Sequence, residues 1–209
     1  MSVPRSEPAG GRVGDTGDAA RELLLRHVGG DGDAFAALVA DYRRPVYSYL
    51  IRCGVAEADR DDLFQTVFLR IHRAAATYQP DRPAHPWLFT IVANEVRTHL
   101  RRSRIRMLVF GHVTTDPEEP APELPDAAPD GERALAARET VAWLDSEIRR
   151  LPVGQREVLL LAGVESLPLK VVAETLGLPL NTVKTHLRRA RLKLGEKLAR
   201  RQRPREERS

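Results

Sequence analysis

The stretch from Leu167 to Leu198, LPLKVVAETLGLPLNTVKTHLRRARLKLGEKL, predicts two helices joined by a tight turn. Gly177 can adopt the left-handed conformation that ends a helix, and Pro179 discourages its continuation. Apolar residues then recur at spacings of three and four, which places them on one face of a second helix: Leu180, Val183, Leu187, Ala190, Leu194 and Leu198. The opposite face is polar and cationic. We expect this second helix to enter the major groove of duplex DNA.

Basic residues are concentrated at the C-terminal end of the chain. The 209 residues carry a net charge of +4, but from Lys184 onward 11 Lys and Arg residues face only 3 Glu residues. Such a local excess attracts phosphate groups and releases the counterions bound to them. The alternative interpretation is a solvated helix face followed by a frayed tail.

Catalytic chemistry has little support in the sequence. The 6 histidines show neither metal-ligand spacing nor a nucleophile motif with Ser or Cys, and no Gly-rich phosphate loop occurs. Asp61 and Asp62 are a paired carboxylate, but they open a predicted helix. Acidic residues there complement the helix dipole, so capping explains the pair better than catalysis does. We therefore expect no enzyme activity, no cofactor, no metal and no small-molecule substrate.

The sequence also restricts the compartment. The single Cys53 excludes an internal disulfide. The first residues lack the apolar core of a signal peptide, and no run approaches the roughly 18 apolar residues that span a membrane. We expect the chain to stay in the cytoplasm without membrane insertion.

Composition predicts an all-α fold, because the cores are mostly Leu, Val and Ala and aromatic residues make up only 5% of the chain. Two small helical domains are expected, joined by a flexible acidic linker rich in Pro. The C-terminal domain contains the helix-turn-helix, preceded by helices over 132–150 and 155–163. The expected segments are a disordered tail over 1–18, a helical domain over 19–110, the linker over 111–132, the helix-turn-helix domain over 133–200 and a basic tail over 201–209.

Several helices are expected in the N-terminal domain. Asp33 is the expected N-cap of one of them, and Pro45 lies near a bend or junction. Another helix spans 59–76. The cluster of breaking residues over 78–86 predicts a loop, and the next helix resumes over 87–106.

The helix over 87–106 ends in a second cationic surface, with five arginines and no acid after Glu95. Binding along a phosphate backbone explains this run better than simple exposure does. The loop ahead of it offers polar and aromatic groups that suit unstacked bases of single-stranded DNA: Tyr78, Arg82, His85 and Trp87. The alternative is that the two aromatic residues belong to the core, which we favour for Trp87.

Three blocks of sequence, in this order, resemble the extracytoplasmic-function (ECF) group of bacterial sigma-70-type sigma factors. The first, DRDDLFQTVFLRIHRA over 59–74, resembles conserved region 2.2. The second, RPAHPWLFTIVANEVRTHLRRSR over 82–104, resembles regions 2.3 and 2.4. The third, LPVGQREVLLLAGVESLPLKVVAETLGLPLNTVKTHLRRARLKL over 151–194, resembles region 4. The long region 3 is replaced by the acidic linker, as this group implies.

The resemblance implies a subunit that binds core RNA polymerase and directs promoter-specific initiation by recognising −35 duplex and melted −10 DNA. In the family, region 2.2 docks on a coiled coil of the polymerase β′ subunit. The matching positions here are Asp62, Gln65 and Phe68. Thr66 stands where the family usually has Glu, which removes a charge from that surface.

The resemblance also implies two sets of DNA-binding residues. The −10 candidates are Tyr78, Arg82, His85, Asn94, Arg97 and Arg101. Thr90 and Ala93 occupy positions where the family often has Arg. The −35 candidates are Asn181, Thr182, Lys184, Thr185, His186, Arg188 and Arg189. His186 replaces a frequent Arg, and a neutral His cannot grip guanine O6 and N7 with two bonds as Arg does.

Further partners follow from the resemblance and from charge. The polymerase β flap is an implied contact, and an anti-sigma factor is a plausible partner. From its charge, we expect the linker to lie in cationic channels of the polymerase. Two alternatives stay open: an autonomous helix-turn-helix transcriptional regulator, which needs a dimer and a pseudo-palindromic operator, and an interaction protein or enzyme whose basic tail binds RNA. The first leaves the region 2-like blocks unexplained, and the second lacks a catalytic constellation.

Overall fold

The computed structural model describes residues 13–110 and 132–202, and every regular element in these ranges is helical. The expected linker lies outside the described residues except for residue 132, as do residues 203–209 of the basic tail. The elements are α1 (Val13–Val28), α2 (Gly32–Cys53), α3 (Glu57–Ala74), the short helix η1 (Ala75–Thr77), α4 (Ala84–Phe110), α5 (Glu132–Arg149), α6 (Val153–Leu159), the π-helical turn η2 (Leu160–Val164), α7 (Leu169–Leu176) and α8 (Leu180–Gln202).

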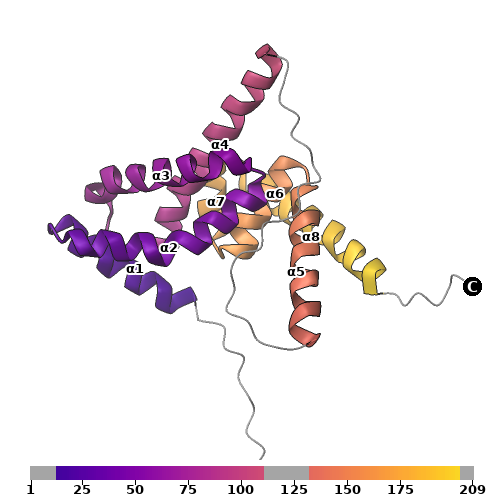
Figure 1. Ribbon diagram of the computed structural model, residues 1–209, viewed down its shortest axis with the longest axis horizontal. Coiled ribbons are helices and arrows are strands. Elements are labelled where there is room, and N and C mark those ends of the chain that lie inside the picture. The colour runs from indigo at the N-terminus through magenta and orange to yellow at the C-terminus, as the bar shows by residue number, and fades with distance from the viewer. Residues whose placement is uncertain (1–12, 111–131, 203–209) are drawn as a thin grey trace, which may run out of the picture.

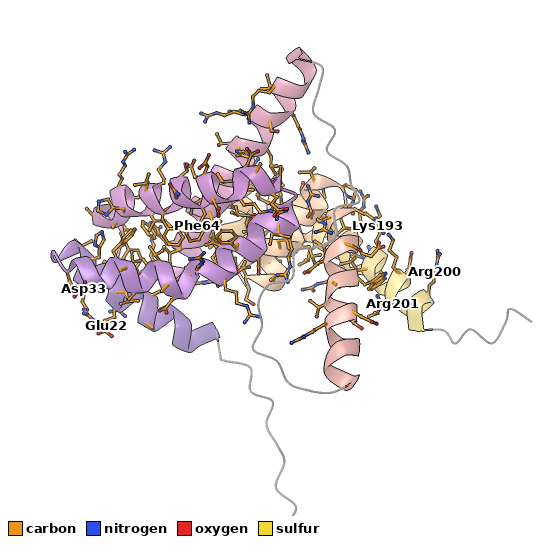
Figure 2. All side chains as sticks on the ribbon, viewed as in Figure 1. Glu22, Asp33, Phe64, Lys193, Arg200 and Arg201 are labelled. Carbon is orange, nitrogen blue, oxygen red and sulfur yellow. The ribbon has the colours of Figure 1, made fainter. Side chains whose placement is uncertain are left out.

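The first four α-helices form a bundle around one apolar core (Figure 1). Its centre is built from side chains that are fully buried, among them Leu24, Leu38, Val67 and Leu88. Aromatic rings fill the space between α2 and α3, where the ring centroid of Phe64, labelled in Figure 2, lies 4.8 Å from that of Tyr47 in α2. The bundle fixes the exposed faces of α3 and α4, which carry the predicted polymerase-binding and −10 residues.

The boundaries of the first two helices differ from the prediction. Helix α1 already begins at Val13, inside the segment expected to be disordered. Helix α2 is capped by Asp31 and not by Asp33, because the Asp31 carboxylate accepts hydrogen bonds from the backbone N–H groups of Asp33 and Ala34 at 3.0 and 3.1 Å. Pro45 lies inside α2, which continues to Cys53.

Helix α4 starts earlier than expected, at Ala84. His85 and Pro86, assigned from the sequence to the loop, therefore occupy its first turn. Proline is tolerated there, since the first N–H groups of a helix have no partner within the helix. The remaining loop is closed by the Tyr78 hydroxyl, which donates to the Arg82 carbonyl at 2.5 Å. At its other end α4 continues past the predicted limit to Phe110 and projects beyond the bundle (Figure 1).

The C-terminal unit consists of α5 to α8. Gly177, with φ of 63°, ends α7 in the left-handed conformation, as the sequence predicts. Helix α8 then buries Val183, Leu187 and Ala190 against the rest of the unit. The helix expected over 155–163 begins at Val153, and its last turn is the π-helical segment η2.

The two units lie against each other. Helix α7 packs on α4, and α5 packs on α2. The buried apolar residues of both units form one continuous cluster. The prediction of two helical domains did not include this contact. Apolar spacing indicates which face of a helix is buried, but it does not indicate which other helix packs on that face.

Candidate nucleic-acid and polymerase interfaces

Helix α8 presents a cationic face opposite its buried one. Its exposed side chains are Asn181, Lys184, Thr185, Arg188 and Arg189. The Thr185 hydroxyl donates to the Asn181 carbonyl at 2.8 Å within the helix. The remaining groups are free to meet an anionic partner, and the tight turn at Gly177 sets α8 at an angle to α7. This is the geometry in which a recognition helix enters a major groove.

His186 lies differently from the other −35 candidates. A Cβ atom added to Gly154 in α6 would lie 2.9 Å from Cε1 of His186, so the imidazole covers the backbone of that glycine. The Nδ1 atom of His186 is buried without a hydrogen-bond partner. The structure therefore turns this ring toward α6, and Thr182 beside it is also half-buried. The contact of His186 with Gly154 explains this placement, and spacing within the sequence could not reveal that contact.

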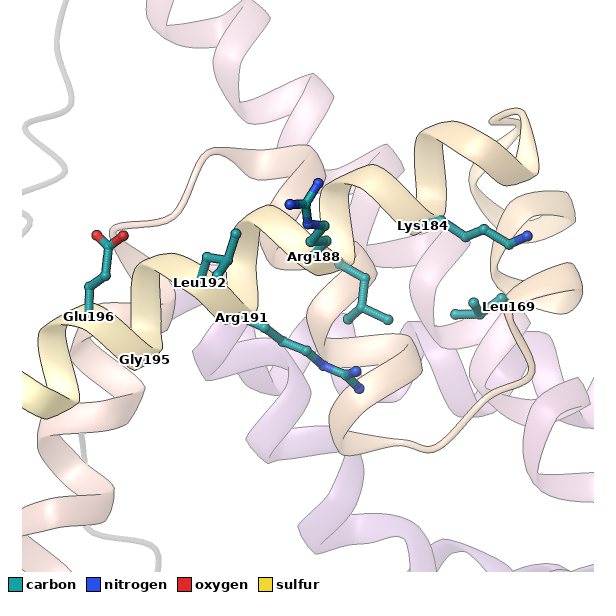
Figure 3. A pocket seen from close by; sticks show the side chains of 8 residues that line it. Leu169, Lys184, Arg188, Arg191, Leu192, Gly195 and Glu196 are labelled. Atoms are coloured by element: carbon teal, nitrogen blue, oxygen red, sulfur yellow. The ribbon is translucent and has the colours of Figure 1, made fainter.

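An open groove runs along α8 on the side of Leu169, the first residue of α7 (Figure 3). Lys184, Arg188 and Arg191 line it, together with the exposed Leu192. Because the spacing of these three cations is four and three residues, their charges add along one edge of the helix. The groove therefore extends the cationic face of α8 and does not form a separate cavity.

Helix α3 exposes a mixed polar and apolar face. Asp62 and Gln65 are exposed on it, as predicted. Phe68 is only 5% exposed and stacks in the core, so it supports the helix and is not open to a partner. Leu69, which is 55% exposed, lies one turn after Gln65. Sequence reasoning missed Leu69, although its spacing of seven from Asp62 places it on the same face.

The −10 candidates divide into an open and a covered group. Arg82, Asn94 and Arg101 are exposed. Tyr78 is 7% exposed, and its ring centroid lies 5.2 Å from that of Trp87. The structure thus places Tyr78 in the core beside Trp87. Of these two aromatic residues, only Trp87 is expected from the sequence to lie in the core.

His85 and Arg97, the two other candidates, contact the C-terminal unit. His85 lies between the Tyr42 hydroxyl, 3.1 Å from Nδ1, and the Glu165 carbonyl, 3.1 Å from Nε2. Arg97 donates to the Thr175 carbonyl at 3.2 Å and lies 3.6 Å from the Glu157 carboxylate. These contacts bring together residues that are 43 or more positions apart, and no local sequence pattern predicts them.

Burial controls the charge state of the His85 cluster. Desolvation raises the pKa of the Glu165 carboxyl to about 7, against a smaller lowering by Arg52. Burial also lowers the pKa of His85, against its hydrogen bond to Glu165. Near neutral pH the imidazole is therefore uncharged and the carboxyl is close to half-protonated, so the cluster does not contain a full ion pair.

No group of three or more His, Cys, Asp or Glu side chains within 13–110 and 132–202 is placed to hold a metal ion. Across these same ranges, no helix has both the length and the apolar character to cross a membrane.

Comparisons with known proteins give the family. The sigma-70 region 2 model matches residues 38–105, and the sigma-70 region 4 model matches residues 142–194. The RNA polymerase sigma factor CnrH of Cupriavidus metallidurans is 33% identical over 177 residues, which is 85% of this chain and 93% of the relative. The ECF sigma factor SigM of Mycobacterium tuberculosis is 30% identical, over 85% of this chain and 83% of the relative.

Solved structures agree in fold. CnrH in complex with the cytosolic domain of CnrY has a TM-score of 0.58 at 27% identity, covering 87% of this chain and 97% of that chain. The sigma factor RpoE of Bartonella quintana, in complex with the anti-sigma factor NepR, has a TM-score of 0.56 at 22% identity, covering 75% and 91%.

The two matched regions and these relatives define a promoter-specificity subunit of RNA polymerase. The chain belongs to the sigma-70 family and, within it, to the ECF subfamily. It binds core RNA polymerase and directs promoter-specific transcription initiation.

Proposed function

We propose that the two helical units, over 19–110 and 133–200, divide promoter recognition between them. The exposed face of α8 reads the −35 duplex, and α4 with the loop before it captures melted −10 bases. The observation that carries this proposal is the two-sided character of α8. Val183, Leu187 and Ala190 fasten one side to the unit, while Lys184 and Arg188 stand free on the other.

Base and phosphate contacts are assigned to different residues of α8. Asn181, at the N-terminal end, and Arg188 have side chains that can pair with base edges, Asn with adenine and Arg with guanine. Lys184 and Arg189 supply point charges for phosphates. Since His186 is turned toward α6, its contribution is to set the position of α8 and not to pair with a base.

The −10 element is assigned to the N-terminal unit. Arg82, Asn94 and Arg101 are exposed and offer charge and hydrogen bonds to a single strand. His85 and Arg97 join them when the C-terminal unit is withdrawn. Tyr78, being buried, supports the loop through its bond to Arg82 and is replaced as a stacking platform by the half-buried Trp87.

The exposed face of α3 is the proposed contact with the β′ coiled coil. Asp62 and Gln65 supply its polar groups, and Leu69 supplies apolar area that is already exposed in the free chain. The β flap is the proposed partner of the C-terminal unit. By similarity to CnrH bound to CnrY and RpoE bound to NepR, we infer that an anti-sigma factor regulates the chain.

Transcription with purified components tests the proposal. Core polymerase alone and core polymerase with this chain are compared on genomic fragments, and transcript 5′ ends are mapped. We expect new start sites that share −35 and −10 elements, and we expect the chain to act in the cytoplasm without catalytic activity of its own. If the chain binds DNA but never redirects core polymerase, the proposed function is wrong.

Double substitution of Asp62→Ala with Gln65→Ala separates the two interfaces. It should weaken binding to core polymerase while DNA binding by the free chain stays unchanged, because neither residue belongs to the proposed DNA-binding sets. The matched control is Asp33→Ala with Glu22→Ala, two exposed acids at the far end of the bundle (Figure 2). Equal weakening by both pairs would mean that general charge, and not the α3 face, binds the polymerase.

A further inference from the structure

Two histidines from distant parts of the sequence meet within the N-terminal bundle. His27 lies in the last turn of α1 and His72 lies in the last turn of α3, 45 positions later. Nε2 of His27 is 3.0 Å from Nδ1 of His72, so a hydrogen bond joins the two imidazoles. Neither residue belongs to the proposed DNA-binding or polymerase-binding sets, so this contact has no role in the function described so far.

The ring of Phe35 in α2 lies beside both imidazoles. Its centroid is 4.6 Å from that of His27 and 5.3 Å from that of His72. Phe35 packs in turn against Phe68, which is buried in the core of the bundle. The two imidazoles are therefore held next to each other by packing, and a ligand that needs both of them finds them already positioned.

The surroundings decide which nitrogen of each ring a ligand can use. Nδ1 of His27 is buried and has no hydrogen-bond partner, which leaves Nε2 as the nitrogen that this ring can offer. His72 is exposed, so the pair can be reached from solvent on its side. When the proton of His27 is on Nδ1 and that of His72 is on Nε2, both facing nitrogens present a lone pair.

The distance between the facing nitrogens matches the spacing of two adjacent ligands on a transition-metal ion. Imidazole nitrogens bind zinc at about 2.0–2.1 Å. At bond lengths of about this size, two nitrogens 3.0 Å apart subtend an angle of about 91–97° at the ion. Adjacent ligands lie at about 90° in square-planar or octahedral coordination and at about 109° in tetrahedral coordination. The pair therefore suits Ni²⁺ or Cu²⁺ better than Zn²⁺.

Two protein ligands leave the other coordination positions of such an ion to water. Within 13–110 and 132–202, no third His, Cys, Asp or Glu completes a cluster with them. Asp31, the acid that follows His27 most closely in the sequence, is engaged by the Arg26 guanidinium at 2.7 Å. An open site of this kind exchanges its ion with solvent, unlike a structural site that four protein ligands close.

We propose that His27 and His72 bind one divalent transition-metal ion, of the class of Ni²⁺ and Cu²⁺, and that the ion ties the end of α1 to α3. Binding replaces the hydrogen bond between the rings. The shared proton moves to the other nitrogen of its own ring, each lone pair turns toward the ion, and the neutral pair releases no net proton. Helix α1 packs mainly on α2 and α4, so the ion adds a direct link to α3. The inference does not depend on the proposed DNA and polymerase contacts.

Calorimetric titration of the untagged full chain with Ni²⁺ tests the site. We expect one ion per chain. His72→Ala and His27→Gln should each weaken binding at least about tenfold, because a single imidazole cannot chelate. The matched control is His99→Ala, which removes a half-buried histidine that lies 3.2 Å from Asp59 in another part of the bundle, and it should bind as the parent chain does. Equal affinity of the parent chain and His72→Ala, or tighter binding of Zn²⁺ than of Ni²⁺, would overturn the proposal.

Thermal unfolding tests the link between the helices. Ni²⁺ should raise the unfolding midpoint of the parent chain, because an ion that binds only the folded pair stabilises the folded state by mass action. The midpoint of His72→Ala should not respond to Ni²⁺. Because His72 is exposed, this variant should unfold at the same temperature as the parent chain when a chelator is present. A rise of equal size in both chains would place the ion elsewhere.

Electron paramagnetic resonance of bound Cu²⁺ counts the ligands without relying on a variant. With less than one ion per chain, the parent spectrum should be tetragonal and show coupling to two imidazole nitrogens. Coupling to one nitrogen, or to three or more, would contradict the site. None of these measurements contains polymerase or DNA. Failure of metal binding therefore leaves the sigma function standing, and failure of the transcription test leaves the metal site standing.

Discussion

At the scale of single residues, the structure assigns different roles to side chains that look alike in the sequence. Lys184 and Lys193 both belong to the basic α8, and both are exposed. They are nine residues apart, which at about 100° per residue places them on opposite sides of the helix. Only Lys184 lies on the face shared with Arg188. Counting cations from the sequence could not make this distinction.

Lys184→Ala should weaken binding to −35 duplex at all sequences about equally, because it removes one phosphate contact. The slope of log K against log salt should fall by about 1. Lys193→Ala, the matched control, should leave this slope nearly unchanged. Fluorescence anisotropy titrations over a range of salt concentrations measure both, and equal slopes for the two variants would contradict the proposed orientation of α8.

Asp31 and Asp33 form a second instructive pair. Asp31→Ala should lower the urea midpoint of unfolding, because two backbone N–H groups at the start of α2 lose their acceptor. Asp33→Ala removes an exposed acid without such a bond and should change the midpoint less. Equilibrium unfolding followed by circular dichroism compares them. A larger effect at Asp33 would restore the cap expected from the sequence.

At the scale of the elements, the sequence was informative wherever apolar spacing and breaking residues agree. Helix α8 and the turn at Gly177 follow the prediction because a left-handed glycine leaves the chain few alternatives. The start of α4 was misplaced because three prolines near His85 looked like a continuous loop, although one of them fits a first helical turn. The exposed Leu69 was missed because apolar residues were assigned to the core by type.

Two leucines of α3 test this distinction. Leu63 is 5% exposed, so Leu63→Ala should lower the free energy of unfolding by about 2–5 kcal/mol. Leu69 is 55% exposed, so Leu69→Ala should stay within about 0.5 kcal/mol of the parent chain. Leu69→Ala should nevertheless weaken binding to core polymerase, measured by competition with a labelled parent chain. Unchanged competition would remove Leu69 from the proposed interface.

At the scale of the whole molecule, the family, the helical class and the two matched regions could be inferred from ordered sequence blocks. The contact between the units could not. It depends on pairs such as Arg52 with Asp145, which are ordinary surface residues when each helix is considered alone. Their partners are fixed only by the fold.

The contact between the units should depend on pH. Burial at the contact raises the pKa of Glu165 to about 7 from its ordinary value of 4.5, so this carboxyl favours contact of the units at low pH, and its contribution is lost as the pH rises through 7. The raised pKa of Glu157 acts in the same direction. The lowered pKa of His85 acts oppositely, because it weakens the contact of the units as the pH falls below 6.5. Tyr42 faces the cluster from α2, and burial raises the pKa of its hydroxyl, so this side chain stays neutral over this range.

Raising the pH from about 6.5 to about 8 should therefore increase the separation of the units. Energy transfer between dyes on exposed positions of α3 and α8 measures this separation. Glu165→Gln should remove most of the change, since its side chain cannot ionise. Arg82→Gln, an exposed substitution outside the cluster, should leave it intact. A pH response that persists in Glu165→Gln would assign the titration to another group.

The unequal exposure of the two DNA readers has a consequence inside a crowded cell. Helix α8 remains open in the free chain, whereas α4 is covered through Thr90 and Arg97. If α8 reads duplex and α4 captures single strands, as proposed, we expect the free chain to associate with intact duplex by charge more readily than with unpaired strands. On this assignment, the order of exposure favours duplex first and separated strands later, which is the order in which a promoter is bound and then opened.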